Sequence, residues 1–165
     1  MSELVKLNEI KQTANKLKAF VVEQGLFTNI QGKNFVHVEG WQFAGASLGI
    51  QPVVKEVTNL NPLGENDEVK WQASVELYRG DQLVGAGVAI CSNKERGKKS
   101  FDEYAIISMA QTRAISKAYR NSIGWIMKLA GYETTPAEEM DNGTGNKNTD
   151  KPDDERISQV AKANR

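Results

Sequence analysis

The sequence predicts an α+β fold, in which an antiparallel three-stranded meander packs on a long C-terminal helix after an N-terminal helix and a hairpin. Apolar residues recur at helical spacing over residues 104–131 and again over residues 3–24. Between residues 52 and 92 they alternate instead, in segments that are joined by short turns. Sequential strands joined by tight turns pair antiparallel, so the doubly wound parallel folds are excluded.

The first third of the chain predicts a helix, a hairpin and a second, short helix. Residues 3–24 form an amphipathic stripe that ends at Gly25, a residue suited to a helix C-cap. Residues 27–38 have the composition of extended structure and are interrupted by a turn at 31–34, which predicts a hairpin. Residues 39–49 combine small and aromatic residues in a pattern typical of a short helix.

Three strands are predicted next, at residues 52–60, 68–79 and 83–92. On the second strand, alternate positions form the apolar face: Val69, Trp71, Ala73, Val75 and Leu77. On the third strand, the expected apolar face comprises Val84, Ala86, Val88 and Ile90. This strand also contains Gly85 and Gly87, which would let the backbone of a helix lie close to the sheet.

The charges of the 165-residue chain cancel overall, but they are unevenly spread. Residues 94–128 carry eight Lys or Arg against three acids, a local balance of +5. Residues 133–155 carry eight acids against two lysines, a local balance of −6. We therefore expect one folded domain over residues 1–140 with a basic surface, followed by an acidic and disordered tail over 141–165.

The residue types that catalysis and metal binding require are scarce. His37 is the only histidine and Cys91 the only cysteine, so a histidine-rich metal site and a zinc ribbon are excluded, and we expect no catalytic triad. Gly97-Lys98 lacks both the first glycine and the following Ser or Thr of a phosphate-binding loop. We expect a protein that is not an enzyme and that uses no metal, no cofactor and no ATP.

No segment predicts export or membrane insertion. The N-terminus lacks the pattern of a signal peptide, and no apolar run is long enough to cross a bilayer. A lone cysteine cannot form an internal disulfide. The expected location is therefore the cytoplasm, of a bacterial cell or of a phage-infected host.

The long helix predicted over residues 104–131 has an apolar side and a cationic side. Its cations recur at helical spacing: Arg113, Lys117, Arg120 and Lys128. The loop that precedes the helix adds four more: Lys94, Arg96, Lys98 and Lys99. Cations held along a rigid support suit the phosphates of a nucleic acid, so these eight residues form the predicted DNA-binding set.

Aromatic side chains can stack on the bases of a single strand. The candidates for this role are Trp41, Phe43, Tyr78 and Phe35. Trp71 and Trp125 are expected to pack in the core instead. Core packing is also the alternative for each of the four candidates.

A combination of four stretches is distinctive: Glu39–Ile50, the meander, Ser108–Asn121 and Leu129–Met140. Together they resemble the single-strand annealing recombinases of the Rad fifty-two-like superfamily, in the phage Sak, Erf and RecT/Redβ class, over about residues 29–140. The resemblance implies rings or filaments that hold single-stranded DNA in a basic outer groove. It also implies that Arg113, Lys117 and Arg120 face the DNA, with Lys98 and Lys99 from the adjoining loop. This chain has room for little beyond the core module of that class.

The function expected from these observations is ATP-independent binding of single-stranded DNA and annealing of complementary strands, in recombination or repair of a phage or prophage type. We expect a homo-oligomer joined through sheet edges and the N-terminal helix, and a partner protein bound by the tail. Two alternatives stay open. One is a small-molecule-binding or enzymatic module with a pocket between sheet and helix, near His37. The other is an adaptor that acts through its tail.

Overall fold

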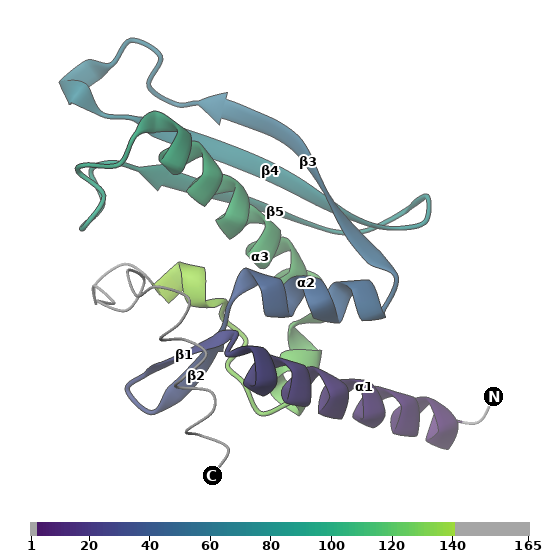
Figure 1. Ribbon diagram of the computed structural model, residues 1–165. Coiled ribbons are helices and arrows are strands. Elements are labelled where there is room, and N and C mark those ends of the chain that lie inside the picture. Colours follow the sequence, from purple (N-terminus) through teal and green to yellow (C-terminus); the bar gives the residue numbers. More distant parts are fainter. Residues whose placement is uncertain (1–2, 141–165) are drawn as a thin grey trace.

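The structure of the protein, a computed structural model, describes residues 3–140, and the expected tail over 141–165 lies outside the described residues. The predicted α+β class and element order are confirmed (Figure 1). The main elements are α1 (Glu3–Gln24), β1 (Phe27–Ile30), β2 (Lys33–Val36), α2 (Val38–Ser47), β3 (Ile50–Asn59), β4 (Lys70–Arg79), β5 (Gln82–Ser92) and α3 (Glu103–Leu129). Two short 3₁₀ helices, η1 (Glu65–Asp67) and η2 (Ala137–Met140), follow β3 and α3.

The meander forms a three-stranded antiparallel sheet in the order β3-β4-β5, and β1 pairs with β2 in a separate hairpin. Helix α3 lies across one face of the sheet, and α2 lies on the other side of α3 (Figure 1). The expected inner face of β4 is confirmed, because Ala73, Val75 and Leu77 are fully buried. The core therefore lies between the sheet and α3 and continues between α3 and α2.

On β5, Val84 packs against the core as expected, next to a register shift in the pairing with β4, but the rest of the expected apolar face is wrong by one residue. Val88 and Ile90 lie on the exposed face of the sheet, whereas Gly87 and Cys91 are buried beneath α3. A side-chain carbon on Gly87 would lie 2.5 Å from the backbone nitrogen of Ala118, so this strand meets the helix backbone directly. Close approach of two backbones thus selects the face with the smallest residues, even though the other face is more apolar.

Helix α3 is buried on two sides rather than one, because the sheet covers one side and α2 and η2 cover another. It also bends at Ile123, whose φ of −128° and ψ of 18° are not helical. Trp125, which was expected in the core, follows this bend and is 46 % exposed. Near the start of the helix, Tyr104 is 71 % exposed.

Both outer edges of the sheet carry features that oppose pairing with a further strand. On β3, Pro52 has no backbone N–H, and the register shift between Val54 and Glu56 forms a bulge. On β5, the carbonyl of Ile90 accepts a hydrogen bond from Arg113 and that of Ala86 accepts one from Asn121. Side chains of α3 therefore occupy acceptors that a neighbouring strand would need.

Candidate nucleic-acid interface

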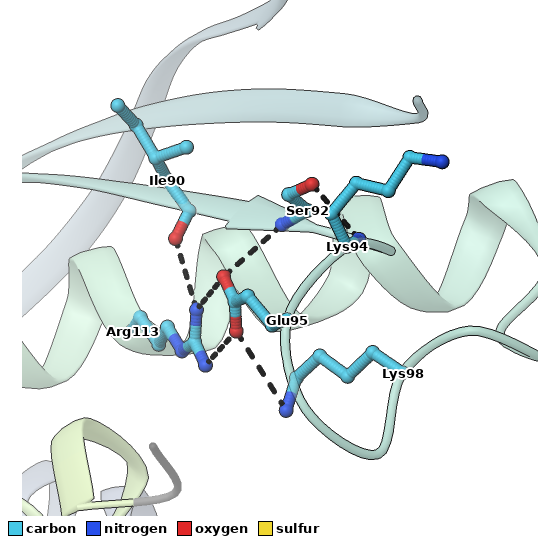
Figure 2. Close-up of polar contacts among 6 residues, drawn as sticks. All are labelled: Ile90, Ser92, Lys94, Glu95, Lys98 and Arg113. Atoms are coloured by element: carbon cyan, nitrogen blue, oxygen red, sulfur yellow. Dashed lines mark hydrogen bonds and ion pairs between the residues drawn. The ribbon is translucent and has the colours of Figure 1, made fainter. Parts of the chain in front are cut away.

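Arg113 is the best-connected cation of the predicted DNA-binding set, and it lies inside the protein. Its guanidinium donates to both carboxylate oxygens of Glu95, at 2.9 and 2.7 Å, and to the Ile90 carbonyl at 3.0 Å (Figure 2). Only 8 % of the residue is exposed. The prediction that Arg113 contacts DNA is therefore wrong. Helical periodicity placed Arg113 on the cationic side of the helix, but its guanidinium pairs with Glu95 of the preceding loop and is buried there.

Glu95 ties the loop over residues 93–102 to the sheet and to α3. Its carboxylate accepts the backbone N–H of Ser92 at 3.1 Å and lies 3.8 Å from the ammonium of Lys98. Burial raises the pKa of Glu95, but the hydrogen bonds and charge of Arg113, with Ser92 and Lys98, outweigh burial and hold the pKa below its ordinary value. Lys98 is 5 % exposed, with its ammonium 5.6 Å from the centre of the Phe101 ring, so its predicted DNA contact is also wrong.

Arg120 has a carboxylate partner as well, from η2. Its guanidinium donates to Glu139 at 2.7 Å, although 38 % of the Arg120 side chain stays exposed. The neighbouring Glu138 accepts the backbone N–H of Val38 at the start of α2, at 2.7 Å, and the Ser116 hydroxyl at 3.2 Å. Burial raises the pKa of Glu138, partly offset by these hydrogen bonds. Segment η2 therefore covers one part of the predicted cationic line with acids.

Four of the predicted cations make no ion pair among residues 3–140: Lys94, Lys99, Lys117 and Lys128. The Lys94 side chain points away from the Arg113–Glu95 pair (Figure 2). Lys94, Lys99 and Lys128 are exposed, as is Arg96, and Lys117 is half-buried. These side chains extend from the loop before α3 to the last turn of the helix.

A pocket of about 200 Å³ is lined by Ala89, Ile90, Arg113, Lys117 and Glu139. It follows the edge of β5, with α3 on one side and η2 on the other. Within the described residues, Oε1 of Glu139 is shielded from solvent and accepts no hydrogen bond. The pocket therefore offers one half-buried ammonium, from Lys117, beside a guanidinium and a carboxylate that are already paired.

The aromatic residues predicted to stack on bases lie away from this edge. Trp41 is fully buried, and its indole N–H donates to the Val36 carbonyl at 3.2 Å. Phe43 stacks on Phe20 of α1, with ring centres 3.9 Å apart. These two predictions, and that for the buried Phe35, are wrong, because α2 and the hairpin pack against the core rather than facing solvent.

Tyr78 differs from the other three aromatic candidates, because it lies on the face of β4 opposite to α3. Its hydroxyl donates to Glu76, two residues away on the same face. This face of the sheet is separated from the cations of α3 by the sheet itself. Tyr78 therefore cannot stack on a base whose phosphates are held along α3.

The residues considered for catalysis are engaged in local contacts. Nε2 of His37 lies 2.7 Å from the Thr28 hydroxyl within the hairpin. Cys91 is buried beneath α3, and burial raises the pKa of its thiol. Over residues 3–140, no cluster of three or more His, Cys, Asp and Glu side chains is arranged to hold a metal ion. Nor does any helix in that range combine the length and the apolar content required to cross a membrane.

Comparison with known proteins gives no match to a family model, to a curated protein or to a solved structure.

Proposed function

We propose that the protein binds single-stranded DNA along the flank of α3 that follows the edge of β5, and that it anneals complementary strands without ATP. The observation that carries this proposal is the charge of α3 and of the loop before it. Residues 104–132 contain four cations and no acid. Lys117 and Lys128 keep no ion pair among the described residues, and Lys94 and Lys99 extend the exposed charge beyond the Arg113–Glu95 pair.

The spacing of these cations suits a flexible polyanion. Lys117 and Lys128 are eleven residues apart, which corresponds to about 16 Å of helix. Phosphates held at such intervals leave the bases free to meet a second strand. Neutralising the phosphates on both strands weakens the repulsion that slows their approach, and pairing then proceeds downhill without hydrolysis.

The alternative, a small-molecule or enzymatic module, requires space between the sheet and the helix. At Gly87 that space is closed, because an added side-chain carbon would lie 2.7 Å from the Ala114 carbonyl oxygen and 2.5 Å from the Ala118 nitrogen. The 200 Å³ pocket opens on the flank of α3 instead and carries Arg113 and Lys117. Because the Arg113 guanidinium there is already paired with Glu95 and Glu139 also lines the pocket, the Lys117 ammonium is the group left to hold an anionic ligand at this flank.

A homo-oligomer stays part of the proposal, since four unpaired lysines on one subunit would hold a strand only weakly. Several subunits on one strand raise the effective concentration of each contact. The sequence suggested two surfaces for association between subunits, the sheet edges and α1. The features on both sheet edges oppose pairing between strands of neighbouring subunits, so α1 is the better candidate for the subunit interface.

The direct test is a strand-pairing assay with two complementary fluorescent oligonucleotides, with and without ATP. We expect the protein to accelerate pairing equally in both conditions, and its binding to a single strand to weaken steeply as salt rises from 50 to 200 mM, because counterions are released. Binding without acceleration of pairing would reduce the function to strand protection. The absence of binding at low salt would refute the proposal.

Within this proposal, replacing Lys117 with glutamine is expected to lower single-strand affinity several-fold. It should also reduce the slope of log K against log salt by roughly 0.7, because one phosphate contact is lost. The matched control is Lys55→Gln, which removes the same charge from β3, the far edge of the sheet. We expect Lys55→Gln to retain wild-type affinity and slope in a fluorescence anisotropy titration. Equal losses in both variants would show that only the net charge matters.

A further inference from the structure

We propose that Trp125 is the side chain on which a base of the bound strand stacks. This inference rests on the proposed function and adds a base-binding position to its phosphate contacts. Trp125 is 46 % exposed, whereas Trp41 is fully buried and Trp71 is half-buried with its indole N–H bonded to Glu103 at 3.0 Å. An exposed indole offers a large flat surface that every nucleobase can use.

Trp125 lies on the part of α3 that follows the residues bordering the edge of β5. Arg113 and Asn121 bond the carbonyls of Ile90 and Ala86 on that edge. Lys117, Asn121 and Trp125 follow one another at intervals of four residues, so each lies about one turn beyond the last and is rotated by about 40° around the helix. The bend at Ile123 lies between Asn121 and Trp125. A strand held by Lys117 would therefore follow the surface of α3 around the helix to reach Trp125, about 12 Å further along.

The surroundings of Trp125 favour a nucleic acid over a second copy of the chain. Lys128 is exposed three residues beyond it, Asn121 is exposed four residues before it, and no acid occurs between Tyr104 and Tyr132. A protein partner would have to bury Lys128 together with the ring, which costs free energy unless it supplies a carboxylate. A nucleotide supplies the phosphate for Lys128 and the base for Trp125 at once.

The ring of Trp125 is exposed just beyond the bend at Ile123. Ile123, at the bend, and Ile126, three residues after it, are buried and fix the last turns of α3 on the core. Gly124, between them, has no atom within 4 Å of the position of an added side-chain carbon. Gly124 itself is buried, so it is the exposed 46 % of Trp125 that a planar base can approach.

The test compares two oligonucleotides, a thymidine strand and an abasic strand of the same length, and two variants, Trp125→Leu and Leu129→Ala. Leucine keeps the apolar bulk at position 125 but removes the aromatic face. Leu129 is exposed on the next turn and serves as the matched control for a purely apolar surface. Binding is measured by anisotropy, the oligomeric state by light scattering and the fold by thermal unfolding.

We expect the wild-type protein to bind the thymidine strand with quenching of its tryptophan fluorescence, and to bind the abasic strand more weakly. Trp125→Leu should lose roughly 5- to 150-fold in affinity for the thymidine strand. It should bind the abasic strand with the same affinity as the wild type. On binding the thymidine strand, it should show little of the tryptophan quenching that the wild type shows. Leu129→Ala should match the wild type on both strands.

Three outcomes overturn the inference. Equal affinity of Trp125→Leu and wild type for the thymidine strand would show that no base stacks on this ring. Equal losses of affinity by Trp125→Leu for the thymidine and abasic strands would show that the ring contacts something other than a base. A loss that accompanies a change of oligomeric state would assign Trp125 to a subunit interface. If the wild-type protein binds neither strand, the proposed function itself fails, which is a separate result.

Discussion

Replacing Glu95 with alanine is expected to lower the free energy of unfolding by about 3–5 kcal/mol, because it leaves the buried guanidinium of Arg113 without its carboxylate. The same change removes the acceptor for the Ser92 N–H and the partner of Lys98. Chemical denaturation at neutral pH, followed by circular dichroism, measures this loss directly.

The matched control for Glu95→Ala is Glu139→Ala, which breaks an ion pair with the same 2.7 Å separation. Arg120 keeps 38 % of its side chain in solvent, so its charge stays hydrated when Glu139 is lost. We expect a change of no more than about 1 kcal/mol. Equal effects in the two variants would show that burial does not govern the strength of these pairs.

The acid stability of the protein follows from the same carboxylate. Because the folded pKa of Glu95 is lower than its ordinary value, its contribution is present above that ordinary value, about 4.3, and is lost as the pH falls through the folded pKa. Glu95→Ala should therefore approach the stability of the wild type as the pH falls through the lowered folded pKa of Glu95.

Replacing Gly87 with valine is expected to destabilise the fold by about 3 kcal/mol or more. The new side chain would meet the Ala118 nitrogen and the Ala114 carbonyl oxygen, and neither backbone atom can move without shifting α3 from the sheet. Thermal and denaturant unfolding measure the loss, and near-ultraviolet circular dichroism reports whether α3 has shifted.

A second glycine provides the control for Gly87→Val. Gly124 lies within α3, and an added side-chain carbon there meets no atom within 4 Å. Gly124→Ala should raise stability by up to about 1 kcal/mol, because alanine favours the helical backbone more than glycine does. If Gly87→Val unfolds at the same temperature as the wild type, the backbones of β5 and α3 are not in direct contact at Gly87.

The order of helices and strands could be predicted from the sequence because each element carries its own periodicity. The inner face of β4 was predictable for the same reason, since Ala73, Val75 and Leu77 alternate with polar residues. On β5, both faces contain apolar or small residues, so alternation alone could not choose between them. Gly87 was the better guide, because it marks where the backbone of α3 must fit.

The candidate site was less predictable, because its charges are paired across distant parts of the chain. Arg113 and Glu95 are 18 residues apart, and Arg120 and Glu139 are 19 apart, so neither pair follows from the spacing within one helix. Trp125 was expected in the core because tryptophan is usually buried, and the bend at Ile123 could not be inferred from composition. The available signal for the exposure of Trp125 was the polar character of its surroundings, since no acid occurs between Tyr104 and Tyr132 and Lys128 follows three residues later.

The edges of the sheet have a consequence for the proposed binding of several molecules to one strand of DNA. Neighbouring molecules held side by side reach local concentrations at which exposed strands would otherwise fuse into continuous β-structure. Here Pro52 and the bulge interrupt one border, and Arg113 and Asn121 occupy the other. If subunits gather along a strand as proposed, these edges allow them to separate again once the two DNA strands have paired.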